Sequence, residues 1–474
     1  MQPLVSYMRT GRLPKLARRF FDGPIYPIIT CLIVLIGSIT KTEFIFNIFN
    51  IAMMCLALLL VDSSLSLVVP FVTFVYQISV ENTPGYPTFS DYYFTGWRVP
   101  VLIILAVFFV LSIGIFLIRN DAPRKLFQKR VPMLIPLLIL SAVWLMNGIL
   151  YDGFALNNFL FALAQVFAYF GLFVIFYAGL SENDDEERIG NRLAYYSFLI
   201  TLVILIELIA RYISISDHAF DVSSIDKLYL NLKNNVLLGW GVCNPIGVSA
   251  AVLIPMNFWG AMRTRHHVIY SVGGALAFLA AVMTMSRNAM LFGSIAFVAC
   301  LVIACFKAER AKPIFRISLA SLIIFALALA IIMRDQIALY MKDIFALGDN
   351  GRYEIWAEGI EKLWESPLFG VGFWNVPSDA YEVGSFIPPF SHQTFVELLA
   401  ATGIIGLAAY LLYRAKSALP FVLRPTLLKT MLGISILVLL FESLLDNYIF
   451  YIYPMIYYNA ALASAFHLDK KSVA

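Results

Sequence analysis

Charged residues are scarce in this chain. Only 14% of its 474 residues are Asp, Glu, Lys or Arg, whereas soluble domains average about 25%. Hydrophobic residues make up 61% of the sequence, and the mean hydropathy is +0.81. A water-soluble fold could not bury this much apolar surface, so lipid must be the solvent for much of it. The composition therefore argues against a soluble enzyme and predicts an integral membrane protein.

Cysteine is also rare, and the common motifs of metal and nucleotide chemistry are missing. All five cysteines fall inside apolar stretches, where they are expected to be buried thiols and to form neither disulfides nor a zinc site: Cys31, Cys55, Cys243, Cys300 and Cys305. The sequence has no P-loop, no HExxH and no Asp-x-Asp on the face predicted below to be outward. We therefore expect no cofactor, no metal ion and no nucleic-acid partner.

Long apolar runs dominate the sequence. A membrane-spanning helix needs about 20 mostly apolar residues, and fourteen windows qualify: 24–40, 44–61, 63–80, 99–118, 131–150, 158–180, 193–213, 234–260, 268–285, 289–306, 314–333, 396–413, 428–444 and 447–466. The first three could instead be two spans and a re-entrant segment. The prediction is an all-α polytopic membrane protein with 12 to 14 transmembrane helices, forming one integral membrane domain over residues 1–474. The basic N-terminus has no small-residue cleavage site after it, so the first apolar run is expected to remain as a span.

Lys and Arg residues orient this bundle. If the N-terminus is cytoplasmic, most of the 34 Lys and Arg residues fall in segments on the cytoplasmic side. The bias holds along the whole chain and favours an even number of spans, with both termini cytoplasmic. The outer face then receives the loops 81–98 and 214–233, a short turn at Ser286, and a long loop over 334–395.

The long outer loop contains the stretch GRYEIWAEGIEKLWESPLFGVGFWN. Tyr353, Trp356, Ile360 and either Leu363 or Trp364 recur in it at helical spacing. The Ser-Pro and Gly-x-Gly sequences that follow are helix-ending signals. We predict an amphipathic helix that lies on the outer membrane surface or caps a cavity.

Three polar features lie on the predicted outer side. Arg287 stands at the edge of a span, where a guanidinium is costly without a partner but can bind phosphate in a forked geometry; it could equally be a snorkelling anchor. His392 directly precedes a span and could take a proton near neutral pH, or serve only as an interfacial residue or helix cap. The run from Lys233 to Pro245 interrupts a span with Asn, Gly and Pro, which indicates either a cavity wall or an ordinary proline kink.

These motifs, taken in order, resemble the O-antigen ligase and O-antigen polymerase superfamily of bacterial polysaccharide enzymes. The matching text is SRNAM at the start of a span, the loop stretch quoted above, and HQTFVELLAATGIIGLAAYLLY. The resemblance implies a GT-C-like membrane fold. It also implies an inverting, metal-independent transfer of a glycan from undecaprenyl diphosphate to an acceptor hydroxyl at the outer face of the bacterial cytoplasmic membrane.

The resemblance also implies roles for individual residues. Arg287 matches the arginine that opens a span and would bind the diphosphate, and Arg352 matches the arginine of the loop helix and would make a second contact. His392 matches the loop histidine and would be the general base. The family often has a further arginine before an Asn-Pro-Asn run. Here that run reads Cys-Asn-Pro-Ile, and either Lys233 or Arg211 could take the role, or the role could be absent.

Other functions remain open on the sequence alone. The acceptor could be another lipid-linked repeat, as in a polymerase, or a surface acceptor, as in a ligase, and the polymerase is mildly favoured. A flippase or transporter of lipid-linked sugars would also have many spans, but the internal repeats typical of transporters are not evident. A non-catalytic partner of an export complex is the third alternative.

Overall fold

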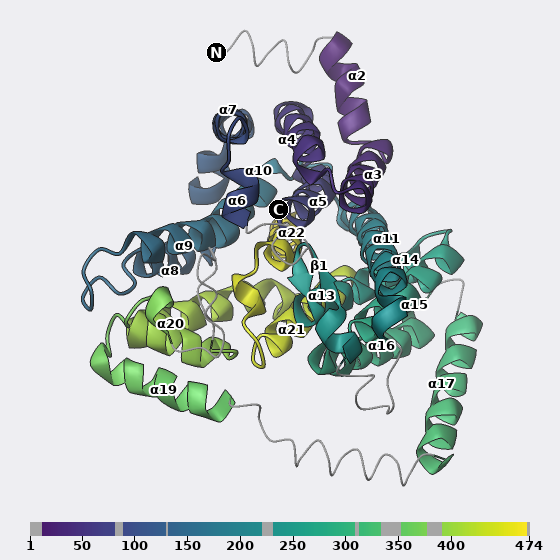
Figure 1. Ribbon diagram of the computed structural model, residues 1–474. Coiled ribbons are helices and arrows are strands. Elements are labelled where there is room, and N and C mark those ends of the chain that lie inside the picture. Colours follow the sequence, from purple (N-terminus) through teal and green to yellow (C-terminus); the bar gives the residue numbers. More distant parts are fainter. Residues whose placement is uncertain are drawn as a thin grey trace.

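The computed structural model of the chain describes residues 12–80, 89–128, 131–219, 231–308, 312–332, 352–376 and 391–471 and is built almost entirely of helices (Figure 1). The elements before the single hairpin are α2 (Arg12–Phe21), α3 (Ile25–Thr40), α4 (Glu43–Leu60), η1 (Ser64–Leu67), α5 (Val68–Ile78), α6 (Phe89–Tyr93), α7 (Arg98–Arg119), η2 (Arg124–Gln128), α8 (Leu134–Leu145), α9 (Leu156–Val166), η3 (Phe167–Gly171), α10 (Leu172–Gly179) and α11 (Glu186–Ala219).

The hairpin pairs β1 (Leu237–Leu238) with β2 (Gly241–Val242) in antiparallel register. The elements after it are α13 (Cys243–Ala251), α14 (Ile254–Arg263), α15 (His267–Met283), α16 (Arg287–Lys307), α17 (Lys312–Ile332), α19 (Arg352–Glu365), η4 (Phe373–Asn375), α20 (Thr394–Val422), α21 (Leu427–Glu442), η5 (Tyr448–Phe450) and α22 (Ile452–Lys471). Each of the fourteen predicted windows overlaps at least one of these helices.

Fewer helices of full spanning length occur among the described residues than the fourteen apolar runs. Among the described residues, seven helices are long and apolar enough to cross a membrane, and an eighth span results if the pair Pro14–Phe21 and Ile25–Thr40, bent by 62°, counts as one. Other predicted windows hold shorter helices, such as α8 with 12 residues and α15 with 17. An apolar run cannot show where a helix shortens or breaks, because burial against other helices makes short helices as apolar as long ones. The chain is an all-α polytopic membrane protein.

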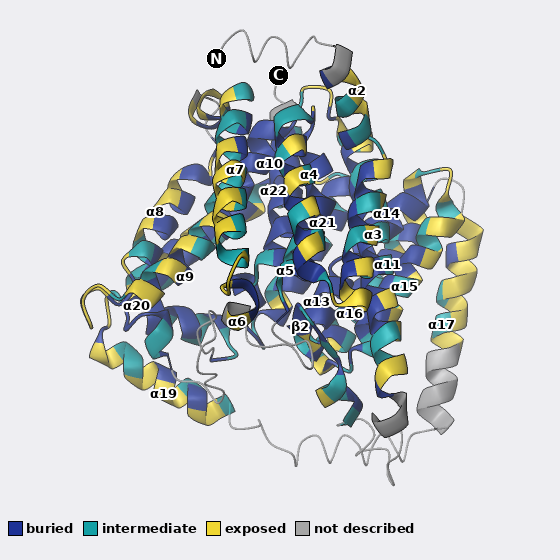
Figure 2. Ribbon diagram, turned by 45° about the horizontal axis from the view of Figure 1, so that its top comes forward, coloured by how far each residue is buried: buried dark blue, intermediate teal, exposed yellow. Residues whose placement is uncertain are grey.

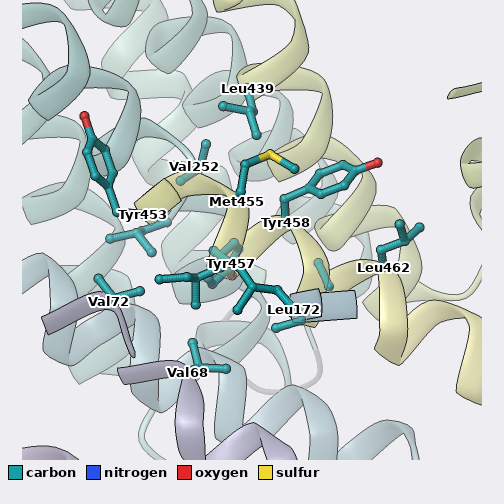
Figure 3. Close-up of a cluster of buried hydrophobic side chains, with 14 of the residues drawn as sticks. Val68, Val72, Leu172, Val252, Leu439, Tyr453, Met455, Tyr457, Tyr458 and Leu462 are labelled. Atoms are coloured by element: carbon teal, nitrogen blue, oxygen red, sulfur yellow. The ribbon is translucent and has the colours of Figure 1, made fainter. Parts of the chain in front are cut away.

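Helix α22 lies at the centre of the bundle. Its residues Met455, Ala460, Leu462 and Ala463 are completely buried. Figure 3 shows side chains of α22 packed against Val68 and Val72 of α5, Leu172 of α10 and Leu439 of α21. Small alanines let these neighbours approach closely, as is typical of helix packing in membranes. The turn that precedes α22 therefore leads directly into a helix whose residues 453–467 are all buried.

Helix α7 shows the opposite pattern and lies at the periphery. Only 11% of its spanning window is buried, and Figure 2 shows exposed residues along its length. Figure 2 also shows α6, β2 and α19 toward one end of the bundle and α2 toward the other. We call the first of these the hairpin end. Residues 81–88, 220–230, 334–351 and 377–390 of the predicted outer loops lie outside the described residues.

Helix α20 is broken at Gly403, which has φ 66° and ψ −170°. The break leaves the carbonyls of Ala400 and Ala401 without helical partners, and they accept hydrogen bonds from the amides of Val371 and Gly372, at 2.8 and 3.0 Å. On the far side of the break, the amides of Ile404 and Ile405 donate to the carbonyls of Pro367 and Leu368. The Pro-Leu-x-Gly-x-Gly motif thus supplies the backbone groups that a broken helix lacks.

Helix α19 occupies the predicted position of the loop helix, but it buries a different face. Ile355 and Gly359 are buried, whereas Tyr353 and Trp364 are 69% and 74% exposed. Gly359 decides this orientation because a Cβ there would lie 2.6 Å from Cγ1 of Val396 on α20. The two helices therefore meet at a glycine, and the side chains of Tyr353 and Trp364 point away from the bundle.

We predict that Gly403→Ala destabilises the protein by at least ~1–2 kcal/mol, the cost of left-handed backbone for a residue with a Cβ. The added Cβ would also lie 2.4 Å from the carbonyl oxygen of Leu368. Thermal unfolding of the purified protein in detergent measures the effect. Gly114→Ala in α7 is the control, because a Cβ there meets nothing within 4 Å, and its melting temperature should not fall. Equal melting temperatures for both variants would contradict the role of Gly403.

Candidate active site

His392 and Asp446 form a hydrogen-bonded pair at the hairpin end of the bundle. His392 lies two residues before α20, and Asp446 lies in the turn between α21 and η5. Nδ1 of His392 is 3.1 Å from Oδ1 of Asp446. The imidazole is 30% exposed and the carboxylate 9% exposed, so the histidine is the member of the pair that a substrate can reach.

Several donors surround the Asp446 carboxylate. The amide N–H of Asn447 donates to Oδ1 at 2.9 Å, and Oδ2 accepts from the Tyr448 hydroxyl at 2.9 Å and the Asn244 side chain at 3.3 Å. Burial raises the pKa of Asp446, but His392 and these donors outweigh burial and hold the pKa below its ordinary value. Because the carboxylate is ionised, Nδ1 of His392 carries a proton and donates it, which makes Nε2 the basic nitrogen.

The backbone around the histidine is held in an unusual conformation. His392 has φ 55°, in the left-handed region. The buried side chain of Glu397 accepts from the amide of Ser391 at 2.8 Å and from the side chain of Asn447 at 3.3 Å. Gln393 caps α20 by accepting from the amide of Val396 at 2.6 Å. Non-glycine residues adopt this conformation only where the surroundings fix it, and such positions concentrate at functional sites.

Arg352, at the start of α19, reaches the same turn. Its Nη1 donates to the carbonyl of Leu445 at 3.0 Å, one residue before Asp446. One helical turn later, the indole N–H of Trp356 donates to the carbonyl of Ser391 at 2.9 Å, one residue before His392. Helix α19 therefore contacts both the segment before His392 and the segment before Asp446, and it brings the guanidinium of Arg352 next to them.

The hairpin brings Lys233 and Arg211 to this end of the bundle. Nε of Arg211 donates to the carbonyl of Asn235 at 2.8 Å. Lys233 lies within electrostatic range of the Cys243 thiol. Asn244, which follows Cys243, donates a hydrogen bond to Asp446. The interrupted span thus contributes directly to the site, and its Asn-Pro sequence places Asn244 at the start of α13.

Arg287 is the first residue of α16. It is exposed, and its side chain makes no hydrogen bond with any described residue. Ser286 caps the helix by accepting from the amide of Ala289 at 3.4 Å. This turn packs on α13 at Gly247, where a Cβ would lie 2.5 Å from Cβ of Ala289. Because Gly247 follows Asn244 by about one helical turn, Arg287 lies at the same end of the bundle as His392 and Asp446.

A small apolar cluster links the three basic residues of the hairpin side. It is formed by Ile215, Leu232, Tyr212 and Met285. Arg211 directly precedes Tyr212, Lys233 directly follows Leu232, and Arg287 follows Met285 by two residues. All five candidate residues from the sequence, namely His392, Arg287, Arg352, Lys233 and Arg211, are therefore at one end of the molecule.

Sequence reasoning did not find Asp446 or Asn244. The predicted spans 428–444 and 447–466 leave only Leu445 and Asp446 between them. An acidic residue in so short a turn on the predicted outer face was the available signal. The role of Asn244 has no comparable signal, because the sequence separation of 202 residues hides its contact with Asp446.

Residues 272–411 match the O-antigen ligase family. The chain contains an O-antigen ligase domain. This match confirms the resemblance to the O-antigen ligase and polymerase superfamily and gives the chain a ligase- or polymerase-type glycosyl-transfer role. A comparison with curated proteins finds no match.

The O-antigen ligase domain contains Arg287, Arg352 and His392 but not every residue that supports the site. Asp446, Asn244 and the two basic residues of the hairpin side lie outside the matched segment. Residues before and after the matched segment thus complete the candidate site. The candidate spans between α4 and α20 make the protein a multi-pass membrane protein.

We predict that Asp446→Asn lowers kcat by about 10²–10⁴-fold, the range that general base catalysis contributes. The amide fills the same space but no longer holds the imidazole in the tautomer that makes Nε2 basic. Tyr448→Phe, which removes one donor to the carboxylate, should have a much smaller effect. Glycan transfer by purified protein in nanodiscs, with melting temperature as the folding control, measures both. A folded Asp446→Asn variant with the wild-type rate would contradict the orienting role.

Proposed function

We propose that this protein transfers a glycan from undecaprenyl diphosphate to an acceptor hydroxyl, as a polysaccharide polymerase of the bacterial cytoplasmic membrane. The observation that carries the proposal is the pair of His392, inside the O-antigen ligase domain, and Asp446, outside it. Arg352 donates to the carbonyl of Leu445 in the turn that holds Asp446. A base with an orienting carboxylate and a neighbouring cation is the arrangement that attack by a hydroxyl on a diphosphate-activated sugar requires.

The proposed reaction is a single displacement. Nε2 of His392 takes the proton of the acceptor hydroxyl as its oxygen attacks the anomeric carbon of the donor. The bond between that carbon and the diphosphate oxygen breaks, and its electron pair leaves with the diphosphate, so the configuration inverts. Asp446 stabilises the imidazolium that forms. The imidazolium then returns its proton to water or to the departing diphosphate.

Basic residues stabilise the leaving group in this proposal. The departing diphosphate gains negative charge, and Arg287 and Arg352 supply guanidinium groups that bind phosphate oxygens in a forked geometry. Arg287 also opens a helix of 21 residues, whose N-terminus favours an anion. Lys233 or Arg211 takes the remaining contact. The step as written needs neither a metal ion nor a cofactor.

The proposed orientation turns the hairpin end outward. The Lys and Arg bias of the sequence places the His392 side outside and both termini in the cytoplasm. The loop helix α19 then roofs the site from the outer face, and the donor's hydrocarbon chain enters from the surrounding lipid. Membrane lipid, the donor and a glycan acceptor are the expected partners.

A ligase that transfers the glycan to a surface acceptor is the second candidate, because the matched family is described by its ligase activity. The chemistry at His392 is the same in both cases. They differ in whether the attacking hydroxyl belongs to another lipid-linked glycan or to a different surface molecule. Products that grow by whole repeats on the carrier lipid would support the polymerase.

We predict that His392→Ala lowers the transfer rate by about 10²–10⁴-fold. Arg287→Ala should cost about 2.7–4 kcal/mol of transition-state stabilisation, as for a lost oxyanion donor, which is roughly 10²–10³-fold in kcat. Synthesis of glycan from purified undecaprenyl-diphosphate-linked repeats in vesicles measures both. Arg265→Ala, at an exposed arginine between α14 and α15, is the matched control and should be active.

Two outcomes would overturn the proposal. Normal polymer from folded His392→Ala and Arg287→Ala proteins would exclude these roles. Movement of labelled lipid-linked sugar across the vesicle membrane without formation of a glycosidic bond would identify a flippase instead.

A further inference from the structure

A cavity of about 340 Å³ lies between the peripheral helix α7 and the bundle, away from the His392–Asp446 pair. Its walls are formed by α4, α5 and α7, with the end of α6 beside them. Representative lining residues are Met54, Phe74, Ile78, Leu102, Ala106 and Phe109. The cavity is large enough for a substantial part of a hydrocarbon chain.

The lining is apolar throughout. Among the described lining residues, the only hydroxyl is that of Tyr93, which accepts from the side chain of Asn47 at 2.9 Å and donates to the carbonyl of Gln77 at 3.4 Å. Two walls, α4 and α7, are candidate membrane spans. An apolar cavity does not hold water. Because these walls lie within the membrane, the molecule available to fill the cavity is the hydrocarbon chain of a lipid.

A cation stands at the end of the cavity nearest the hairpin end. Arg98 opens α7, with its guanidinium 4.5 Å from the ring centre of Tyr92 and 5.1 Å from that of Phe44. Its Nη1 donates to the carbonyl of Tyr92, and its other N–H groups donate to no described residue. The lining residues Leu102 to Phe109 lie roughly 6–16 Å further along α7 at 1.5 Å per residue. A lipid phosphate at Arg98 would therefore place its chain in the cavity.

Helix α5 separates this cavity from the candidate active site. Phe74 and Ile78 face the cavity, whereas Tyr76, between them, stacks on Trp240 of the hairpin at 3.8 Å between ring centres. The hairpin leads within four residues to Asn244, which binds Asp446. Tyr93 of the cavity lining donates to the carbonyl of Gln77 on α5 at 3.4 Å, so this part of the cavity lies across α5 from the hairpin. A lipid chain held in this cavity is therefore separated by α5 from the hairpin that leads to Asn244.

We propose that this cavity binds the isoprenoid chain of the second lipid-linked substrate, the acceptor, with its phosphate at Arg98. The inference rests on the proposed polymerase function, in which donor and acceptor each carry such a chain. The attacking hydroxyl of the acceptor belongs to its glycan and lies several bonds from the lipid. A carrier site across α5 from the hairpin therefore lets the acceptor's glycan reach toward His392 while the donor's diphosphate occupies the basic residues.

The test is photo-crosslinking of purified protein in nanodiscs with a polyprenyl diphosphate that carries a diazirine in its chain. Ala106→Trp fills the cavity and should reduce labelling of α7 by about tenfold or more. Val107→Trp, one residue along the same helix and 53% exposed, is the matched control and should label as the wild type does. Arg98→Gln should weaken labelling by the diphosphate probe and leave labelling by the free alcohol unchanged.

Equal labelling of the Ala106→Trp and wild-type proteins would overturn the proposal. The proposal would also be overturned if phosphatidylglycerol displaced the probe as effectively as polyprenyl diphosphate does. An ordinary phospholipid would then be the occupant. In the transfer assay, Ala106→Trp should raise KM for the lipid-linked acceptor about tenfold and leave KM for the donor unchanged. Labelling does not require turnover, so a labelled protein that makes no polymer would refute the proposed function and leave the binding site intact.

Discussion

The ionised carboxylate of Asp446 is the constraint on which the candidate site depends. A charge in so buried a place is costly unless its surroundings satisfy it. Four groups do so here: the imidazole of His392, the Tyr448 hydroxyl, the amide of Asn447 and the side chain of Asn244. They come from three distant parts of the chain, so the carboxylate both orients the histidine and ties the hairpin, the loop before α20 and the turn before α22 together.

The position of that turn explains why the arrangement is rigid. It directly precedes α22, whose residues 453–467 are all buried in the centre of the bundle. The left-handed backbone of His392 faces it, fixed by the bonds of Glu397 and the cap of α20. A base that must meet a substrate hydroxyl within hydrogen-bond distance benefits from such a fixed position.

The motif that is most conspicuous in the sequence has a structural and not a chemical role. The residues from Pro367 to Gly372 donate and accept the backbone hydrogen bonds that the break at Gly403 leaves open. This join fixes the first half of α20, and with it the loop that carries His392, against α19. The position of α19 beside the loop that carries His392 therefore depends on a backbone contact at Gly370, Gly372 and Gly403.

The sequence by itself determined that lipid is the solvent of this protein and where its helices lie along the chain. It also identified most of the basic residues that lie together at one end of the bundle. Apolar composition fixes lipid as the environment, and the Arg287 and His392 motifs can be read because each directly precedes an apolar run. The tertiary structure alone decided the number of full-length spans, the buried face of α19 and the partnership of His392 with Asp446. These depend on which helices touch. Asp446 lies 54 positions from His392 and 202 positions from Asn244. Such hydrogen bonds, like the glycine contact of α19, leave no periodic pattern in one sequence, because their energy comes from burial and geometry.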